Sequence, residues 1–147
     1  MRDSTVPLAL VNEGLGNTSY LVDLGDGRAL VVDPERDPGK YLAAAEARGL
    51  TIGYTAETHL HADFVSGSRE LAAHGAQVLA PAAGGIEFGH RGLRDGDELG
   101  LGGLALRALA TPAIPLNIWP TCWRTAAARS RCSPADRCWW GRSPALT

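Results

Sequence analysis

The first 112 residues of this 147-residue chain predict an α/β or α+β fold. Two observations lead to this prediction. Short apolar runs bounded by Gly, Asp and Asn dominate the beginning of the chain, which is typical of strands joined by tight turns. Helix start and stop signals then appear between the later runs. Strands that dominate early, with helices interspersed, favour these two fold classes over an all-helical protein.

The apolar runs are each short enough for single strands, and turn residues separate them. Gly25-Asp26-Gly27 is a hairpin turn, and Gly102-Gly103 is expected at the tip of a later hairpin. Asp95-Gly96-Asp97 is a further turn. The expected strands cover residues 8–11, 18–23, 29–33, 51–58 and 77–80, with a hairpin at 99–109.

Two segments carry helix signals. Asp37 can cap a helix whose first residue is Pro38, and Gly49 is a typical residue after a helix end. Ser66 can cap a second, short helix that runs through His74. The apolar face of the first helix consists of Tyr41, Leu42 and Ala45.

Composition excludes several functional classes. The chain is 45% hydrophobic and 20% charged, and its formal net charge is −2. A charge so near zero gives no reason to expect a nucleic-acid or membrane-surface partner. No apolar run approaches the roughly 18 residues of a membrane span, and no signal-peptide pattern follows Met1. We therefore expect a cytoplasmic protein, of an oligomeric state that the sequence does not fix.

The composition changes abruptly after Pro112. Residues 113–147 contain five Arg and one acidic residue, a net charge of +4, which leaves −6 for residues 1–112. Such a break predicts two parts: a partial domain at 1–112, and a tail at 113–147 without a native domain. The tail also holds every cysteine and tryptophan of the chain: Cys122, Cys132, Cys138, Trp119, Trp123, Trp139 and Trp140.

The candidate chemistry lies in His59-Leu60-His61-Ala62-Asp63-Phe64, directly after an expected strand. Residues two apart in an extended chain point the same way, so His59 and His61 can converge on one ion. Asp63 could bind a second ion or orient a metal-bound water, and imidazole ligands suit zinc or ferrous iron. The alternative is a pair of polar histidines in an exposed loop. Asp33 is expected to orient backbone near this site.

This segment resembles the His-x-His-x-Asp-His signature of the metallo-β-lactamase superfamily. Residues 17–22, 31–37 and 57–67 further resemble the persulfide dioxygenase branch, whose members often carry a rhodanese domain. The resemblance implies the N-terminal part of an αββα sandwich, incomplete here, with a metal at one edge of its two sheets. It also implies a mononuclear iron held by His59, a later Gly-His histidine and an aspartate, with His61 and Asp63 lining the site.

Two departures from the family pattern bear on this expectation. Phe64 replaces the last histidine of the signature, which favours one metal over two. Thr111-Pro112-Ala113-Ile114 stands where the family continues Thr-Pro-Gly-His, and no histidine follows His90.

The genetic code explains the second departure. In the reading frame that joins the last base of each codon to the first two bases of the next codon, the Trp119–Pro120 junction must encode Ala. In the same frame, residues 138–141 must encode Leu-Val-Gly. Permitted choices elsewhere supply the missing Gly-His and further family-like strands. The sequence thus predicts a frameshift after Pro112 by loss of one G.

The expected function is that of a sulfur dioxygenase acting on a small thiol or persulfide such as a glutathione derivative. His61 and Asp63 are its candidate catalytic residues, and His59, His61 and Asp63 its candidate metal ligands. Fe(II) is the expected cofactor of the intact family form and Zn(II) the alternative, while the chain as written is expected to be impaired and to hold little or no metal. The other readings are a metal-dependent ester or thioester hydrolase, and a non-catalytic remnant.

Overall fold

The computed structural model describes residues 7–58, 65–110 and 121–126, and two sheets and two helices account for most of them. No helix in these ranges is long and apolar enough to cross a membrane. In chain order the elements are β1 (Leu8–Asn12), β2 (Asn17–Asp23), β3 (Arg28–Val32), α1 (Gly39–Glu46), β4 (Thr51–Ala56), α2 (Ser68–Ala73), β5 (Gln77–Pro81), β6 (Arg91–Leu93), β7 (Glu98–Leu101), β8 (Leu104–Ala110) and β9 (Thr121–Ala126).

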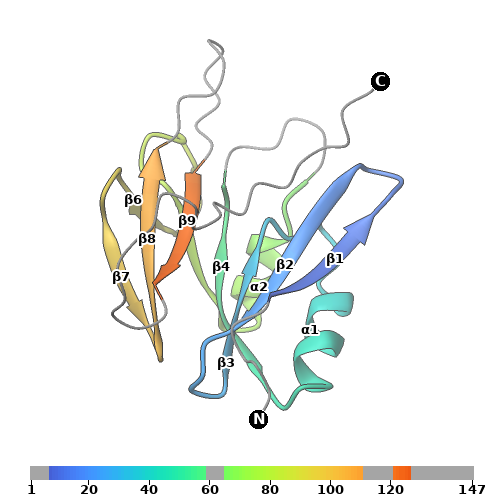
Figure 1. Ribbon diagram of the computed structural model, residues 1–147. Coiled ribbons are helices and arrows are strands. Elements are labelled where there is room, and N and C mark those ends of the chain that lie inside the picture. Colours follow the sequence, from blue (N-terminus) through green and yellow to red (C-terminus); the bar gives the residue numbers. More distant parts are fainter. Residues whose placement is uncertain (1–6, 59–64, 111–120, 127–147) are drawn as a thin grey trace, which may run out of the picture.

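The larger sheet has six strands in the order β1-β2-β3-β4-β5-β6 (Figure 1). Strands β1 to β3 pair antiparallel, whereas β3 to β6 pair parallel. The parallel pairs need crossover connections, which α1 and α2 supply between β3 and β4 and between β4 and β5. Because β3 and β4 run in the same direction, the residues that follow them, including Asp33 and Thr58, leave the sheet at the same edge.

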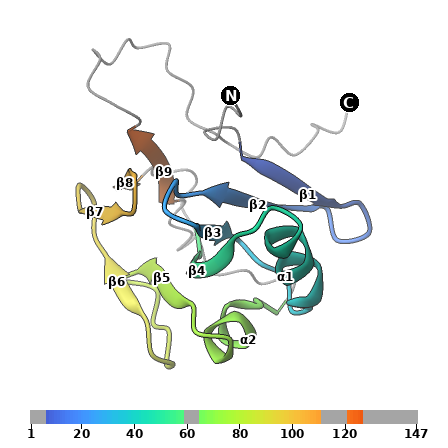
Figure 2. The same cartoon turned by 90° about the horizontal axis from the view of Figure 1, so that it is seen from below.

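The smaller sheet is antiparallel, in the order β7-β8-β9. Figure 2 shows it on one face of the six-stranded sheet, with α1 and α2 on the other. The architecture is therefore an α/β fold with a partial sandwich, as the sequence predicts. Strand β9 falls in the tail at 113–147, and the division of the chain at residue 112 stays a prediction.

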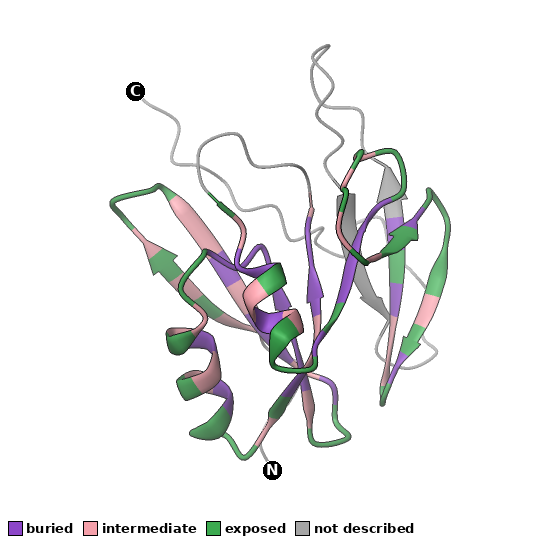
Figure 3. Cartoon of the chain, turned by 180° about the vertical axis from the view of Figure 1, so that it is seen from behind, coloured by how far each residue is buried: buried purple, intermediate pink, exposed green. Residues whose placement is uncertain are grey.

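Each face of the large sheet has its own core, and the strands between them are mostly buried (Figure 3). Between the sheets, Leu30 and Leu79 of the large sheet share one cluster with Leu101 and Leu106 of the small one. On the helical face, Tyr41 of α1 is fully buried against strand residues such as Val31. Burial of a Val- or Leu-sized side chain contributes about 1.5–3 kcal/mol to the free energy of folding. The two cores therefore hold the strands, and with them the strand ends, in place.

Local signals placed most elements correctly, with small differences at the helix starts. Helix α1 begins at Gly39, so Pro38 and not the predicted Asp37 occupies the N-cap position, and the Asp37 carboxylate accepts a hydrogen bond from the Gly39 amide at 2.9 Å. Helix α2 begins at Ser68, capped by Gly67, while Ser66 accepts from the Ser68 amide at 3.1 Å. The short strand β6 carries no sequence signal and forms through its pairing with β5.

Candidate metal centre

The candidate ligand segment follows β4. Strand β4 ends at Ala56, and Glu57 and Thr58 continue from it. The candidate residues His59, His61 and Asp63 lie outside the described residues, so their proposed roles stay predictions. The structure does show the residues that hold the chain on either side of this segment, and these form the frame of the candidate site.

Asp33 holds the chain immediately before His59. Its carboxylate accepts two hydrogen bonds from Thr58, at 2.8 Å from the backbone amide to Oδ1 and at 2.6 Å from the hydroxyl to Oδ2. Its own amide donates to the carbonyl of Ala56 at 2.8 Å. Hydrogen bonds to a charged acceptor contribute about 1.5–3 kcal/mol each. Asp33 therefore orients the backbone of Thr58, as predicted, whereas the site that follows in the sequence stays a prediction.

Asp33 also has an uncommon backbone conformation. Its φ is 50°, and among the described residues other than glycine no further one has a positive φ. Aspartate tolerates this region better than most residues, because its short side chain can form local hydrogen bonds. The Asp33 carbonyl accepts a hydrogen bond from the Ser19 hydroxyl at 2.8 Å. Hydrogen bonds therefore fix both the side chain and the main chain of this residue, which offsets the cost of its conformation.

The chain that follows the ligand segment is held by the next two residues after Asp33. The Gly67 amide donates to the Pro34 carbonyl at 2.9 Å, and Ser66 forms an isolated antiparallel bridge with Glu35. The two chains lie so close that a Cβ on Gly67 would stand 1.9 Å from the Glu35 carbonyl oxygen. Only glycine fits at this position. The reason is the short distance to the Glu35 backbone and not the φ of −86°, which any residue can adopt.

Glu57 joins the two sides of the ligand segment directly. Its side chain is buried, and Oε1 accepts hydrogen bonds from the hydroxyls of both Ser66 and Ser68. The sequence analysis included Glu57 and Ser66 in a family resemblance but assigned Glu57 no role. The sequence offered one indication of this role, because Glu57 and Ser66 flank the candidate ligands on either side.

A second buried carboxylate, Glu35, links the hairpin of β1 and β2 to α1. Its Oε2 accepts from Lys40 Nζ at 2.6 Å and from Asn12 Nδ2 at 2.9 Å, and its Oε1 from Asn17 Nδ2 at 3.5 Å. Burial raises the pKa of Glu35, but the hydrogen bonds from Lys40 and Asn12 outweigh burial and lower it overall. Glu35 is therefore a charged anchor between the β1–β2 hairpin and α1.

The donors that could hold a metal are those of the ligand segment. Within the ranges that the structure describes, no three His, Cys, Asp or Glu side chains form a group that could bind an ion. Two imidazoles and one carboxylate, the donors at positions 59, 61 and 63, are a set that zinc and ferrous iron accept. Beside them, the hydrogen bonds of Thr58 and Gly67 fix both flanks, so the residues present fit a metal in donor chemistry.

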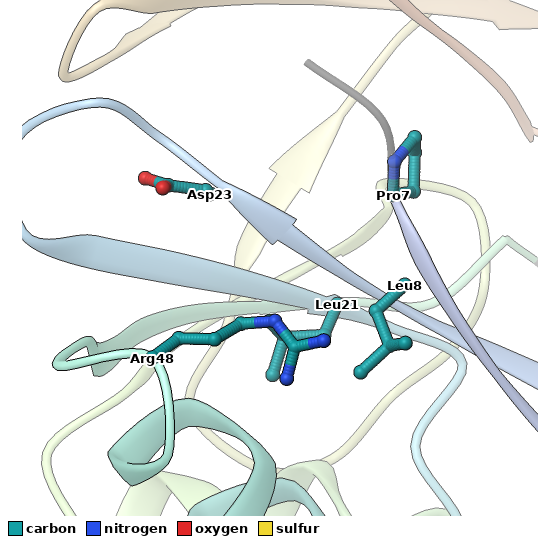
Figure 4. Close-up of a pocket in the computed structure, with 5 residues that line it drawn as sticks. All are labelled: Pro7, Leu8, Leu21, Asp23 and Arg48. Carbon is teal, nitrogen blue, oxygen red and sulfur yellow. The ribbon is translucent and has the colours of Figure 1, made fainter. Parts of the chain in front are cut away.

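Two surface hollows lie elsewhere, toward the opposite ends of the strands. One, of about 210 Å³, is lined by Pro7, Leu8, Leu21, Asp23 and Arg48, where β1 begins and β2 ends (Figure 4). The other, of about 230 Å³, lies between α1 and the start of β4 and includes His74. Neither contains residues of the frame around Thr58.

Comparison with known proteins gives consistent results. The family described as Metallo-beta-lactamase superfamily matches residues 12–126. The hydroxyacylglutathione hydrolase of Methylobacillus flagellatus is 43% identical over 81 residues, which cover 54% of this chain and 32% of that protein. The chain thus spans about a third of that relative's length.

Two solved structures illustrate the structural similarity. A metallo-beta-lactamase from Staphylococcus aureus superposes with a TM-score of 0.67 and 31% identity, covering 73% of this chain and 34% of that one. ETHE1 from Myxococcus xanthus superposes with a TM-score of 0.73, covering 82% of this chain and 53% of that one. At 24% identity, the second similarity shows the fold alone.

Proposed function

The chain belongs to the metallo-beta-lactamase superfamily, and from this membership we propose that it carries the N-terminal part, with the first metal ligands, of an enzyme that hydrolyses a thioester of glutathione. The 43% identity to a hydroxyacylglutathione hydrolase supports this substrate class. The first proposed function is thus a thioester hydrolase, which the sequence analysis gave as the alternative, and no longer a sulfur dioxygenase.

In this proposal His59 and His61 are metal ligands, and Asp63 binds the metal or holds the attacking water. Zinc is the proposed ion and Fe(II) the alternative. Bound zinc would make hydroxide available near neutral pH. In thioester hydrolysis the hydroxide oxygen bonds to the carbonyl carbon, the carbon–sulfur bond breaks, and the glutathione thiolate leaves and takes up a proton. Asp33, through Thr58, would fix the backbone from which His59 extends.

A second candidate function, oxidation of glutathione persulfide with dioxygen, is favoured by one specific observation. Phe64 stands where the family signature ends in histidine, and its side chain cannot coordinate a metal. A site with one metal is less affected by this change than a site with two. The dioxygenase reading uses a single Fe(II), so Phe64 supports it over a two-metal hydrolase.

Both readings need ligands beyond residues 59–63. The proposed loss of one G after the Pro112 codon accounts for their absence, since the alternative frame supplies a Gly-His pair. We therefore propose that the chain as written is impaired, and that the activity belongs to the protein read in the alternative frame.

One experiment separates these proposals. The chain as written and a version with one G inserted after the Pro112 codon, extended to the next stop in that frame, are purified and loaded with zinc or with Fe(II) under anaerobic conditions. Metal content, hydrolysis of a hydroxyacyl thioester of glutathione, and oxygen uptake with glutathione persulfide are then measured. Thioester hydrolysis by the restored protein supports the first reading, whereas iron-dependent oxygen uptake supports the second.

The control for the proposed ligand is His59→Ala in the restored protein, which should lose both bound metal and turnover. If turnover is unchanged in that variant, His59 is not a ligand. If the restored protein binds no metal at all, the metalloenzyme proposal is wrong for this chain.

A further inference from the structure

Strand β1 forms one margin of the six-stranded sheet (Figure 1). All five of its residues pair in unbroken register with β2 on one side. On its other side, no strand in the described part of the chain pairs with it. An edge strand presents a row of backbone N–H and C=O groups that can pair with a further strand, and proteins usually protect such edges with charges, prolines, bulges or very short strands.

Strand β1 lacks these protections, whereas the other edges of the described sheets have them. The sequence of β1, Leu-Ala-Leu-Val-Asn, contains no charged residue and no proline, and its pairing with β2 contains no bulge. At the opposite margin of the large sheet, β6 is three residues long and includes Arg91. In the smaller sheet, β7 includes Glu98 and β9 includes Arg124. Strand β1 is therefore the edge best suited to pair with another strand.

The side chains of β1 are incompletely covered on both faces of the sheet. Leu8 and Leu10 face the helices and are half-buried at the margin of that core. The hollow shown in Figure 4 lies beside Leu8 on this face. Ala9 and Val11 alternate with the leucines and point to the other face, where both are exposed, Val11 by 65%. A strand alongside β1 would therefore cover apolar surface on both faces.

A second copy of the same strand fits this edge. Two β1 strands can run antiparallel about a two-fold axis at Leu10, which places Ala9 opposite the partner's Val11. No like charges meet in this arrangement, and the leucines at position 10 extend the helical-side core of each copy toward the other. A free peptide strand would leave its own outer edge open, whereas two β1 strands satisfy both unprotected edges at once.

We propose that β1 is a homodimer interface, at which two copies of this chain pair their edge strands into one continuous sheet. The two-fold pairing is closed, so it predicts dimers and no larger assembly. It involves neither the candidate ligands nor a metal, and it is therefore independent of the proposed function.

The test measures the mass of the full chain by sedimentation equilibrium, from low micromolar to submillimolar concentration. The mass should rise from the 15.5 kDa of one chain toward twice that value and then stay constant. Over the same range, amide hydrogen exchange of residues 8–12 should slow, because the free edge of β1 becomes hydrogen-bonded in the dimer.

Charge substitutions at Val11 identify the interface. The two Val11 side chains would be diagonal neighbours about 7–8 Å apart, so Val11→Lys and Val11→Glu should each raise the dimer dissociation constant by about tenfold or more. An equimolar mixture of the two variants at low salt should associate again, because opposite charges then meet. Val65→Lys is the matched control, since Val65 is 62% exposed and lies outside β1. All three variants should keep the urea midpoint of the dilute chain, because both positions are exposed.

Several results would overturn the homodimer. A mass of one chain at every concentration would do so, and protected amides at residues 8–12 would then assign the edge to another segment of the same chain. A mass that rises beyond two chains would exclude the closed two-fold pairing. Dimers that persist in both Val11 variants, or that weaken equally in Val65→Lys, would exclude β1 as the interface. If the mixed Val11 variants stay monomeric, the two Val11 side chains are not neighbours and the antiparallel register is wrong.

Discussion

Gly67→Ala should destabilise the protein more than any ordinary glycine-to-alanine change. The added Cβ would lie 1.9 Å from the Glu35 carbonyl oxygen and 2.8 Å from its carbonyl carbon. Ordinary contact begins at 3.4 Å, so one of the two chains must move by about 1.5 Å. The obstacle is backbone, which cannot rotate away as a side chain could.

The magnitude follows from what this movement breaks. Insertion of a methyl group into a well-packed site costs about 1–3 kcal/mol. The shift also strains the 2.9 Å hydrogen bond from the Gly67 amide to the Pro34 carbonyl, for which loss costs about 1 kcal/mol. We therefore expect a loss of about 2–4 kcal/mol from a total stability that is typically about 5–15 kcal/mol.

The assay is urea unfolding followed by far-ultraviolet circular dichroism, with Gly100→Ala as the matched control. A Cβ at Gly100, in β7, would meet no atom within 4 Å, so this variant should be neutral or more stable by about 0.5–1 kcal/mol. Gly67→Ala should also weaken zinc binding, because it displaces the chain after the ligand segment. If Gly67→Ala and Gly100→Ala unfold at the same urea concentration, the close approach of Gly67 and Glu35 is not a constraint and the reasoning is wrong.

Four further predictions follow from the frame and from the sequence. Asp33→Ala should lower the free energy of unfolding by about 3 kcal/mol or more, because two charge-assisted hydrogen bonds are lost and alanine disfavours the positive φ. Asp33→Asn should lower it less. The urea midpoints of the two variants test this, and equal losses would contradict the role of the carboxylate. The pKa of Glu35 is lowered in the folded protein, so the ionised side chain stabilises the fold above the unfolded pKa, and this contribution is lost as the pH falls through the folded pKa. Glu35→Gln should therefore make the stability less dependent on pH in the acid range. An unchanged pH dependence of the stability would contradict this role of Glu35. The dialysed chain as written should contain less than one metal ion per chain, which one tightly bound ion would contradict. DNA sequencing across codon 113 should show one G fewer than the family-like frame requires, and an intact frame would exclude the frameshift.

The local elements follow from residues close together in the sequence. Gly25 and Gly27 have positive φ values of 78° and 84° in the turn that their pattern predicts, and Gly49 ends α1 with a φ of 69°. These features depend on the intrinsic conformational freedom of glycine and are readable from the sequence. Both helices start one or two residues later than their cap signals predict, which is the usual variation at helix ends, and the Asp37 and Ser66 side chains accept hydrogen bonds from the amides two residues ahead.

Sequence alone determined the fold class, most of the strands and turns along the chain, the His59-to-Asp63 pattern and the family resemblance that the comparison confirmed at superfamily level. Only the tertiary structure decided how the flanks of that pattern are held. The bond from Thr58 to Asp33 joins residues 25 positions apart, and it exists because β3 and β4 pair in parallel with a particular register. The contact of Gly67 with Glu35 and the bonds from Ser66 and Ser68 to Glu57 depend likewise on where α2 packs against the sheet. Register and packing are properties of the whole chain, since a strand finds its partner by the total burial that the pairing gives, and no local pattern encodes the resulting distances.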